Sequence, residues 1–345
     1  MKARTIILDG MGGDHAPAEI VAGAALASMQ TEHKICIVGD EERIREELAK
    51  RKHNPAAIET VHAEEVIHGH DAPVKAIRTK KRSSIVVGIN MVRDGQGDVF
   101  ISAGNTGALM AGGLFILGRI QGVDRPALAS TYPVLSGGVS LLVDSGANSE
   151  CKPNNLLEFA AMGSIYMEQV MDIEKPTVGL VNMGTEENKG TMVLKSAYTM
   201  LSRSRDELDA LNFIGNIEAR DVPNGPADVL VCDGYVGNVI LKLTEGLAWS
   251  MLKLLKRKFT ANIFTKMGAA MLGGKLKELK EVFDYSEYGG APILGVRGAM
   301  VKLHGSSNAG AVKNAILKSV PYVENGVVRR IEERMIGMEA IAISE

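Results

Sequence analysis

Short and almost uninterrupted apolar runs recur along this chain, and each ends in glycine, aspartate or asparagine before a helical pattern begins. Strands that are apolar throughout are typical of a parallel sheet with both faces covered, whereas strands with one face in water alternate apolar and polar residues. The alternation of such strands with helices predicts an α/β fold, doubly wound around a mostly parallel sheet. The predicted strands cover residues 5–10, 34–40, 98–105, 139–148, 177–184, 211–216 and 228–234.

The polar clusters at the ends of these strands are candidates for a ligand site. Open α/β sheets bind ligands beyond the carboxyl ends of their strands. A structural turn explains any single cluster well, because glycine and asparagine are ordinary turn residues. Their repetition after seven predicted strands favours a ligand site, and we expect the clusters to share one edge of the sheet.

Composition narrows the class of protein. The 345 residues carry a net charge of −2, which gives no general attraction to nucleic acid, and 4% aromatic residues offer few platforms for stacking bases. The three cysteines lack a C-x-x-C spacing, and the apolar runs are shorter than the roughly 20 residues that span a bilayer. We expect a cytoplasmic protein with one main domain, residues 1–345, that does not bind nucleic acid.

One segment does not follow the alternation of apolar strands and helices. Residues 248–277 hold seven lysines and arginines and no acidic residue. The spacing of apolar residues predicts two amphipathic helices, an insert over residues 247–283 with a basic polar face. That face is either the solvated side of a packed helix pair or a surface for an acidic partner or anionic lipid headgroups. The apolar positions are Leu247, Met251, Leu254, Leu255 and Phe259, then Ile263, Met267, Ala270 and Met271.

Familiar cofactor and nucleophile motifs are incomplete. The nearest match to a P-loop, at Gly274-Lys275, is out of register and lacks a preceding strand. The glycine-rich residues 10–15 lack the third glycine of a dinucleotide fingerprint, which makes NAD a weak candidate. His68 and His70 lack partners for a metal site, and no G-x-S-x-G elbow is present. We expect no metal and no cofactor, and an attacking group that belongs to a substrate.

Two loops have the composition of anion-binding sites. Gly104, Asn105 and Thr106 open a helix, where N–H groups and the helix dipole favour a phosphate. Asn105 and Thr106 serve equally well as helix N-caps. In the GTEENKG run, Lys189 stands at the start of a helix, where a cation opposes the dipole. A bound anion would compensate for this, and an ion pair with Glu186 in water is the alternative.

Together the motifs resemble the phosphate acyltransferases of the PlsX family, in order and along nearly the whole chain. The matching motifs are DGMGGDHAP (9–17), ISAGNTGALM (101–110), GRIQGVDRPALA (118–129), DSGAN (144–148), NMGTEENKG (182–190), FIGNIEARD (213–221), DGYVGNVILK (233–242), YSEYGGAPILGV (285–296) and HGSS (304–307). The resemblance implies a homodimer with a fold similar to isopropylmalate dehydrogenases and phosphotransacetylases. It also implies transfer of a long-chain fatty acyl group from acyl carrier protein to inorganic phosphate, giving acyl phosphate for phospholipid synthesis.

By motif, the family's catalytic lysine and asparagine fall on Lys189 and Asn238. Our hypothesis is that Lys189 holds the phosphate, while Asn238 donates its amide to the thioester carbonyl as negative charge develops. The exchange of these roles is the alternative. His15 and His304 serve either as proton carriers or as structural residues. The expected substrate-binding residues are Gly12, Gly13, Asp14, His15, Gly104, Asn105, Thr106, Asn148, Thr185, Asp233, Gly237 and His304.

The basic segment has two candidate partners. Acyl carrier protein is strongly acidic, so a lysine-rich face would attract it. The resemblance also implies a protein peripherally associated with the inner face of the cell membrane, where exposed apolar residues enter the lipid interface. The alternatives to the acyltransferase are a coenzyme A-dependent phosphotransacetylase, a hydroxyacid dehydrogenase and a non-catalytic scaffold of lipid synthesis. The expected contact residues are Trp249, Leu252, Lys253, Lys256, Arg257, Lys258 and Phe259.

Overall fold

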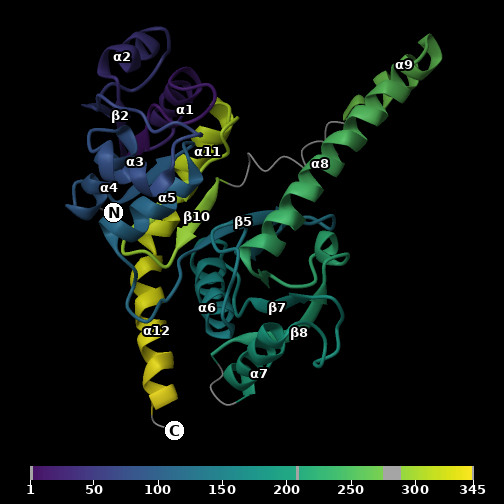
Figure 1. The fold of residues 1–345 in the computed structure, drawn as a ribbon. Coiled ribbons are helices and arrows are strands. Elements are labelled where there is room, and N and C mark those ends of the chain that lie inside the picture. The colour runs from purple at the N-terminus through teal and green to yellow at the C-terminus, as the bar shows by residue number, and fades with distance from the viewer. Residues whose placement is uncertain (1–2, 207–209, 275–288, 344–345) are drawn as a thin grey trace.

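The computed structural model describes residues 3–206, 210–274 and 289–343, and shows two lobes built on one sheet (Figure 1). The strands are β1 (Thr5–Asp9), β2 (Lys34–Gly39), β3 (Ile58–His62), β4 (Val99–Ser102), β5 (Ala127–Pro133), β6 (Val139–Val143), β7 (Thr177–Asn182), β8 (Asn212–Glu218), β9 (Val229–Val231), β10 (Ala291–Leu294) and β11 (Ala299–Lys302). The helices are α1 (Ala18–Ser28), α2 (Glu41–Ala49), α3 (Pro73–Thr79), α4 (Ser84–Arg93), α5 (Thr106–Gly112), α6 (Pro153–Val170), α7 (Met192–Asp206), α8 (Gly234–Phe259), α9 (Ile263–Met271), α11 (Ala309–Glu324) and α12 (Val327–Ile343). A π-helical turn, η1 (Gly113–Leu117), and a 3₁₀ turn, η2 (Val222–Asn224), complete the described elements.

Within the described residues, eleven strands form one sheet in the order β3-β2-β1-β4-β11-β10-β5-β6-β9-β7-β8. The strands on either side of the centre pair in parallel, which confirms the predicted mostly parallel sheet. At the centre, β10 is antiparallel to both β11 and β5, and β5 is antiparallel to β6. After these three reversals, β6, β9, β7 and β8 run opposite to β1, β4 and β11.

The expectation that all polar clusters share one edge of the sheet is therefore wrong. The loops after β1, β4 and β11 leave one edge, and the loops after β6, β9 and β7 leave the other. The reversals depend on β5 and β10, which the sequence pattern missed. Ser130 and Thr131 interrupt the apolar character of β5, and Pro292 lies in β10. The partly exposed β3 and the short β11 were missed as well.

Different helices cover the two faces of the sheet, which confirms the doubly wound fold. Ile6 and Leu8 of β1 pack in one core with α1 and α11, whereas Ile7 packs on the other face with α3, α4 and α5. In β9, Leu230 packs under the base of α8, while the residues on either side of it face α6. Burial on both faces explains why the predicted strands are apolar throughout.

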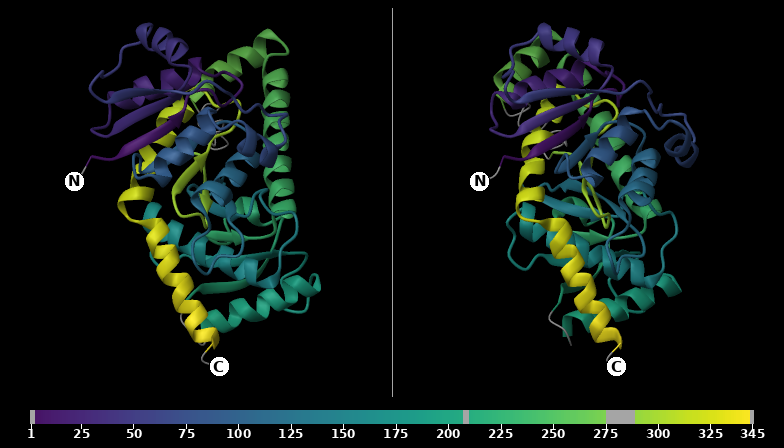
Figure 2. Two further views of the ribbon diagram at one scale, coloured as in Figure 1. Left: turned by 60° about the vertical axis from the view of Figure 1, so that its left-hand side comes forward. Right: turned by 90° about the vertical axis from the view of Figure 1, so that its left-hand side faces the viewer.

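Helix α8 starts at the sheet and leaves the body of the protein as one helix of 26 residues, which α9 extends (Figures 1 and 2). The sequence predicted a separate helix pair from residue 247, but α8 already begins at Gly234. The break lies at Asn262, whose side chain accepts the N–H of Thr265 and caps α9. Residues 275–283 of the predicted insert lie outside the described residues.

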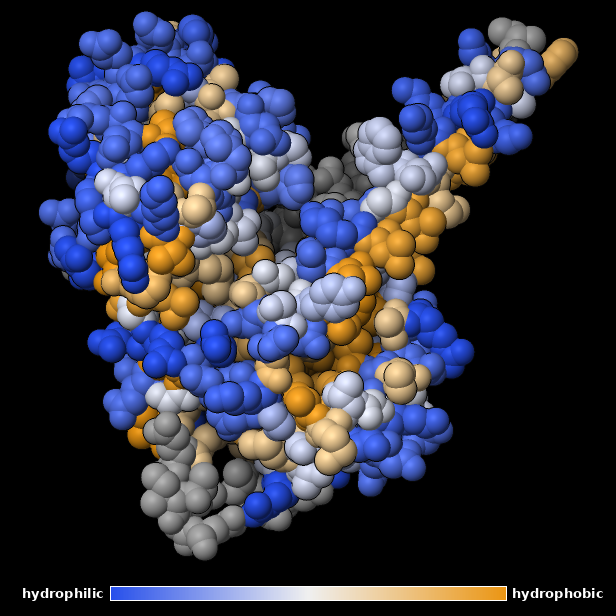
Figure 3. Space-filling model, in the orientation of Figure 1, coloured by the Kyte–Doolittle hydropathy of each residue, from blue (hydrophilic) through white to orange (hydrophobic). Residues whose placement is uncertain are grey.

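Exposed apolar side chains form a stripe along α8 and α9 (Figure 3). We call Leu243, Leu247, Met251, Leu254, Phe264, Met267 and Leu272 the apolar stripe. None of the described helices has both the length and the apolar character needed to cross a membrane.

Candidate active site

Asp144 organises the loop that follows β6. Its buried carboxylate accepts hydrogen bonds of 2.7–3.1 Å from the backbone N–H groups of Leu128, Gly146, Ala147 and Asn148. The side-chain amide of Asn148 donates to the same carboxylate at 2.9 Å. Burial raises the pKa of Asp144, and these hydrogen bonds oppose the rise. The loop is thus fixed around a single acidic side chain.

Helix α8 begins against this loop. Asp233 caps the helix by accepting the N–H of its third residue at 2.8 Å, and the N–H of Gly234 donates to the Asn148 carbonyl at 2.7 Å. A Cβ atom on Gly234 would stand 2.8 Å from the Asn148 backbone, and one on Gly237 would stand 1.9 Å from the Asp144 carbonyl oxygen. Real Cβ contacts do not come this close, so both glycines are needed for α8 to pack here.

Asn238 follows in the first turns of α8, with its side chain exposed. It lies beside Gly146, where a Cβ atom would stand 3.8 Å from the Asn238 amide oxygen. Lys242 lies one turn further on the same helix face and pairs with Glu245 at 2.7 Å. The first part of α8 therefore presents the Asn238 amide and the Lys242 ammonium on one face of the helix.

The loop after β7 carries Lys189. Because β7 pairs in parallel with β9, this loop and the start of α8 leave the same edge from adjacent strands. Asn182 donates to the Lys189 carbonyl at 3.2 Å, and Asn216 donates to the Glu186 carbonyl at 2.8 Å. The Lys189 side chain passes over Gly184, and its ammonium lies 3.7 Å from the Glu186 carboxylate. The ion pair with Glu186 is thus present, on an exposed and accessible lysine.

The loops after β1, β4 and β11 line a pocket of about 570 Å³ at the other edge. Below it, the buried carboxylate of Asp9 accepts from the Ser102 hydroxyl at 2.6 Å and from the N–H of Met11 at 3.1 Å. Burial raises the pKa of Asp9. A Cβ atom on Gly12 would stand 2.3 Å from that carboxylate, so Gly12 shapes the loop. The lining residues are Met11, Gly13, Asp14, Ala103, Gly104, Asn105, Thr106, Gly107, Lys302, Gly305 and residues 66–70.

The pocket brings together five predicted substrate-binding residues, namely Gly13, Asp14, Gly104, Asn105 and Thr106. The side chain of Asn105 accepts the N–H of Ala108 at 3.0 Å and so caps α5. It also donates to the carbonyls of His68, Gly69 and Asp71 at 3.1–3.2 Å. Asn105 therefore ties the wall of the pocket together, and the N-cap alternative is confirmed.

The remaining predicted residues do not line the pocket. His15 and Thr185 are exposed, and the exposed His304 ring bonds the Ser306 hydroxyl at 2.8 Å. Asn148 binds the Pro126 carbonyl at 2.8 Å and so supports the 144–148 loop. Among the described residues, no three histidine, cysteine, aspartate or glutamate side chains are grouped so as to hold a metal ion.

Lys302, at the end of β11, lines the pocket. Burial lowers the pKa of Lys302 to about 8, the charges of Asp9 and Asp14 raise it, and the charge of Lys242 on α8 lowers it further. Figure 3 shows a notch between α8 and the lobe that contains β1 to β4, which we call the first lobe.

Sequence reasoning missed Asp9, Asp144, Lys242 and Lys302. A signal was present for each of them. Asp9 is the last residue of the apolar strand β1, and Asp144 directly follows the apolar strand β6. Lys302 is a lone charge in the apolar run AMVKL, and Lys242 stands four residues after Asn238. What the sequence lacked was the place of each residue in the folded chain.

The predicted contact residues lie toward the outer end of α8. Trp249 is exposed, and the Lys253 ammonium lies 5.6 Å from the centre of its ring. Lys256, Arg257 and Lys258 are exposed in the last turn, whereas Leu252 and Phe259 are only partly exposed. The exposed apolar surface of α8 therefore comes mainly from the apolar stripe and Trp249.

Solved structures with this fold include phosphotransacetylases. One from Streptococcus pyogenes matches with a TM-score of 0.65 and 14% identity, over 94% of this chain and 95% of its own. A branched-chain phosphotransacylase from Enterococcus faecalis matches with a TM-score of 0.56 and 14% identity, over 93% of this chain and 99% of its own. This likeness shows that the chain has the α/β fold of the phosphotransacetylases, as predicted.

Sequence comparison defines the family. A family model described as "Fatty acid synthesis protein" matches residues 4–330. The phosphate acyltransferase of Alkaliphilus oremlandii is 52% identical over 328 residues, which are 95% of this chain and 96% of that protein. The phosphate acyltransferase of Clostridioides difficile is 47% identical over 95% of both chains. The chain belongs to the phosphate acyltransferase family and is an acyl-transferring enzyme.

Proposed function

We propose that this enzyme transfers a long-chain fatty acyl group from acyl carrier protein to inorganic phosphate and releases acyl phosphate for phospholipid synthesis. The observation that carries the proposal is that the start of α8 with Asn238 and the loop with Lys189 leave the same edge of the sheet from the adjacent strands β9 and β7. An amide donor near a cation suits a reaction between a neutral carbonyl and an anion. Positioning and charge stabilisation then supply the catalysis.

The proposed reaction is a single acyl transfer without an enzyme-bound intermediate. A phosphate oxygen attacks the thioester carbonyl carbon and forms the new C–O bond. The carbonyl oxygen gains negative charge, which the side-chain amide of Asn238 stabilises by donating a hydrogen bond. The C–S bond then breaks, and the proton of hydrogen phosphate ends on the carrier sulfur. Acyl phosphate and free carrier thiol leave.

The packing of α8 supports this role for Asn238. An oxyanion donor is effective when it is held in place before the reaction, since no energy is then spent on reorienting it. The contacts of Gly234 and Gly237 with the 144–148 loop hold the first turn of α8 in this way. Asn238 follows directly and stays exposed to a substrate.

Lys189 supplies positive charge from the neighbouring loop in this proposal. Its ion pair with Glu186 is exposed, and such pairs contribute only about 0–1 kcal/mol. Breaking this ion pair therefore costs little free energy. The ammonium then turns toward the phosphate while a phosphate oxygen bonds to the carbonyl carbon. The exchange of roles between Lys189 and Asn238 is the competing assignment.

The outer part of α8 fits the proposed partners. Lys253, Lys256, Arg257 and Lys258 are exposed and attract an acidic carrier protein. The apolar stripe exposes more apolar surface than a helix in water ordinarily does. Such a surface suits peripheral binding to an anionic membrane or contact with the second subunit of a homodimer. We propose that the enzyme works in the cytoplasm at the inner face of the cell membrane.

A thiol-release assay with long-chain acyl carrier protein tests the reaction. Free thiol is expected to appear only when phosphate is present, together with an equal amount of acyl phosphate, and to be lost in Lys189→Ala. Thiol release without phosphate would contradict the proposal. Equal turnover with acyl-coenzyme A would favour the phosphotransacetylase alternative, and no turnover with either donor would favour the scaffold.

A charge-reversal variant separates the two partners of α8. Lys256→Glu, Arg257→Glu and Lys258→Glu together are expected to raise KM for the acyl carrier protein, because the basic face attracts it. Binding to vesicles that contain anionic lipid is measured on the same variant. Unchanged carrier KM with lost vesicle binding would assign this face to the membrane instead.

A further inference from the structure

Lys302 stands in the pocket without an ionic partner. It is half-buried at the end of β11, opposite Ser102 of β4, and its ammonium donates to the Leu303 carbonyl. Among the described residues, no carboxylate lies within salt-bridge distance of this ammonium. An ammonium group has three N–H donors, so two remain for a ligand. A cation removed from water is stabilised by opposite charge or hydrogen bonds, which favours an anion in this pocket.

Lys302 is partly shielded from water in this pocket. Burial lowers its pKa to about 8, although the charges of Asp9 and Asp14 act to raise it. The Asp9 carboxylate is already engaged by Ser102 and the backbone. An anion bound beside the Lys302 ammonium would stabilise its charged form.

Asp14 adds a negative charge to the pocket, which restricts the kinds of anion that the pocket can bind. Its N–H donates to the Gly305 carbonyl at 2.8 Å, and a Cβ atom on Gly305 would stand 3.3 Å from its carboxylate. Asp14 is therefore held against the loop after β11, in the same pocket as Lys302. An ionised carboxylate can only accept hydrogen bonds, so it tolerates an anion only if that anion carries a proton of its own. Hydrogen phosphate has such a proton, whereas sulfate, with the same shape and charge, has none.

We propose that this pocket is the acceptor subsite: Lys302 binds the charge of hydrogen phosphate, Asp14 accepts a hydrogen bond from its proton, and the pocket thereby selects phosphate over sulfate. The inference rests on the proposed function for the identity of the acceptor. It assigns ground-state phosphate binding to the pocket, so that Lys189 acts mainly on the charge of the transition state. The stacked rings of His68 and His70, 5.6 Å apart, face the same pocket.

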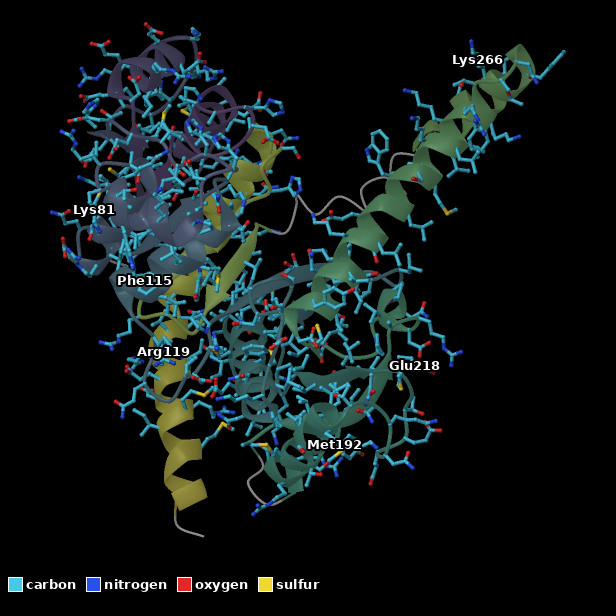
Figure 4. All side chains as sticks on the ribbon, viewed as in Figure 1. Lys81, Phe115, Arg119, Met192, Glu218 and Lys266 are labelled. Atoms are coloured by element: carbon cyan, nitrogen blue, oxygen red, sulfur yellow. The ribbon has the colours of Figure 1, made fainter. Side chains whose placement is uncertain are left out.

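Steady-state kinetics of Lys302→Met test the first part. KM for phosphate is expected to rise about tenfold or more, the equivalent of about 1.4 kcal/mol, while kcat and KM for the acyl donor change little. Lys81→Met is the matched control, because Lys81 is exposed on the outer side of the first lobe (Figure 4). A phosphate KM within about twofold of wild type in Lys302→Met, while wild type and control agree, overturns the assignment.

The pH profile tests the same assignment in a variant that keeps the charge. The charges of Asp9, Asp14 and Lys242 act on Lys302, and the titratable His68 and His70 line the same pocket. In the wild type, kcat/KM for phosphate is expected to fall as pH rises through about 8, because Lys302 then loses its proton. Arginine stays charged, so this fall is expected to disappear in Lys302→Arg. The same fall in both proteins contradicts the proposal.

Sulfate competition tests the role of Asp14. Sulfate is expected to inhibit the wild type weakly and Asp14→Asn at least about tenfold more strongly relative to phosphate, because an amide can donate to an oxygen that carries no proton. The same ratio of sulfate inhibition constant to phosphate KM in both proteins overturns this role.

Direct binding separates this inference from the proposed function. Inorganic phosphate is titrated into wild type, Lys302→Met and Lys81→Met by calorimetry without any acyl donor. Binding lost only in Lys302→Met supports the subsite even if phosphate-dependent thiol release is absent. Thiol release that depends on phosphate, with binding intact in Lys302→Met, leaves the function standing and removes the subsite.

Discussion

The carbonyl oxygen of Asp144 lies 1.9 Å from the position that a Cβ atom on Gly237 would occupy. The first turn of α8 is therefore seated directly on the backbone of the 144–148 loop. Asn238 is the next residue, so the contact that excludes a side chain at residue 237 also sets the position of the proposed oxyanion donor. The same contact joins the loop after β6 to the helix after β9.

Gly237→Ala is expected to push α8 away from Asp144. Overpacking of this kind destabilises by about 1–3 kcal/mol, and the displaced Asn238 should lower kcat as well. Thermal unfolding and turnover are measured together. Gly246→Ala is the matched control in the same helix, because a Cβ atom there meets nothing within 4 Å and alanine favours a helix. Equal stability and turnover in Gly237→Ala and Gly246→Ala would refute the seating argument.

Asn238→Ala is expected to lower kcat by about 10²–10³, the usual effect of removing one oxyanion donor. Its melting temperature should stay near that of wild type, since the side chain is exposed. Val239→Ala, at the neighbouring exposed position, controls for changes in the helix itself. Near-normal turnover in Asn238→Ala would remove this residue from the mechanism.

Lys189→Met is expected to lower kcat more than it raises KM for phosphate, because its charge acts as the new bond forms. Glu186→Gln is the informative comparison, since it removes the ionic partner of Lys189 and leaves the lysine. Turnover in Glu186→Gln should remain close to wild type, because exposed pairs contribute little. A large rise in phosphate KM without a loss of kcat in Lys189→Met would place ground-state phosphate binding at Lys189 instead of Lys302.

The buried Glu158 is expected to make the free energy of unfolding depend on pH. Burial raises the pKa of Glu158 from 4.5 to about 6, although the Asp124 N–H donates to its carboxylate at 3.0 Å. The folded state therefore binds more protons than the unfolded state in this window, and the stability contributed by Glu158 is lost as pH rises through about 6. Relative to Glu158→Gln, the wild type should lose about 2 kcal/mol of unfolding free energy between about pH 4 and about pH 7.

Urea unfolding of both proteins across this range measures the Glu158 effect. Glu150→Gln, at an exposed position, is the matched control. A constant difference in unfolding free energy between wild type and Glu158→Gln would show that the carboxyl group titrates alike in the folded and unfolded chain.

The sequence by itself determined the class of fold and much of the local structure. Strands such as β1 and β9 are apolar on both faces because helices cover both sides, so their pattern predicted a doubly wound parallel sheet. Asn105 caps α5, one of the two roles that its place before a helix predicted, since a short polar side chain there satisfies free N–H groups of the helix. The motifs also indicated the phosphate acyltransferase family, which the comparison confirmed. All of these are local properties of consecutive residues.

Only the tertiary structure decided which motifs face each other. Local periodicity marks a strand but not its neighbour or direction, and the three antiparallel pairings around β5 and β10 send the two groups of loops to opposite edges of the sheet. The packing of the first turn of α8 on the 144–148 loop brings Asn238 beside Gly146, 92 residues earlier in the chain. Such a contact depends on how the whole sheet is assembled, because the strands that precede the two segments, β6 and β9, are neighbours in the sheet and not in the sequence.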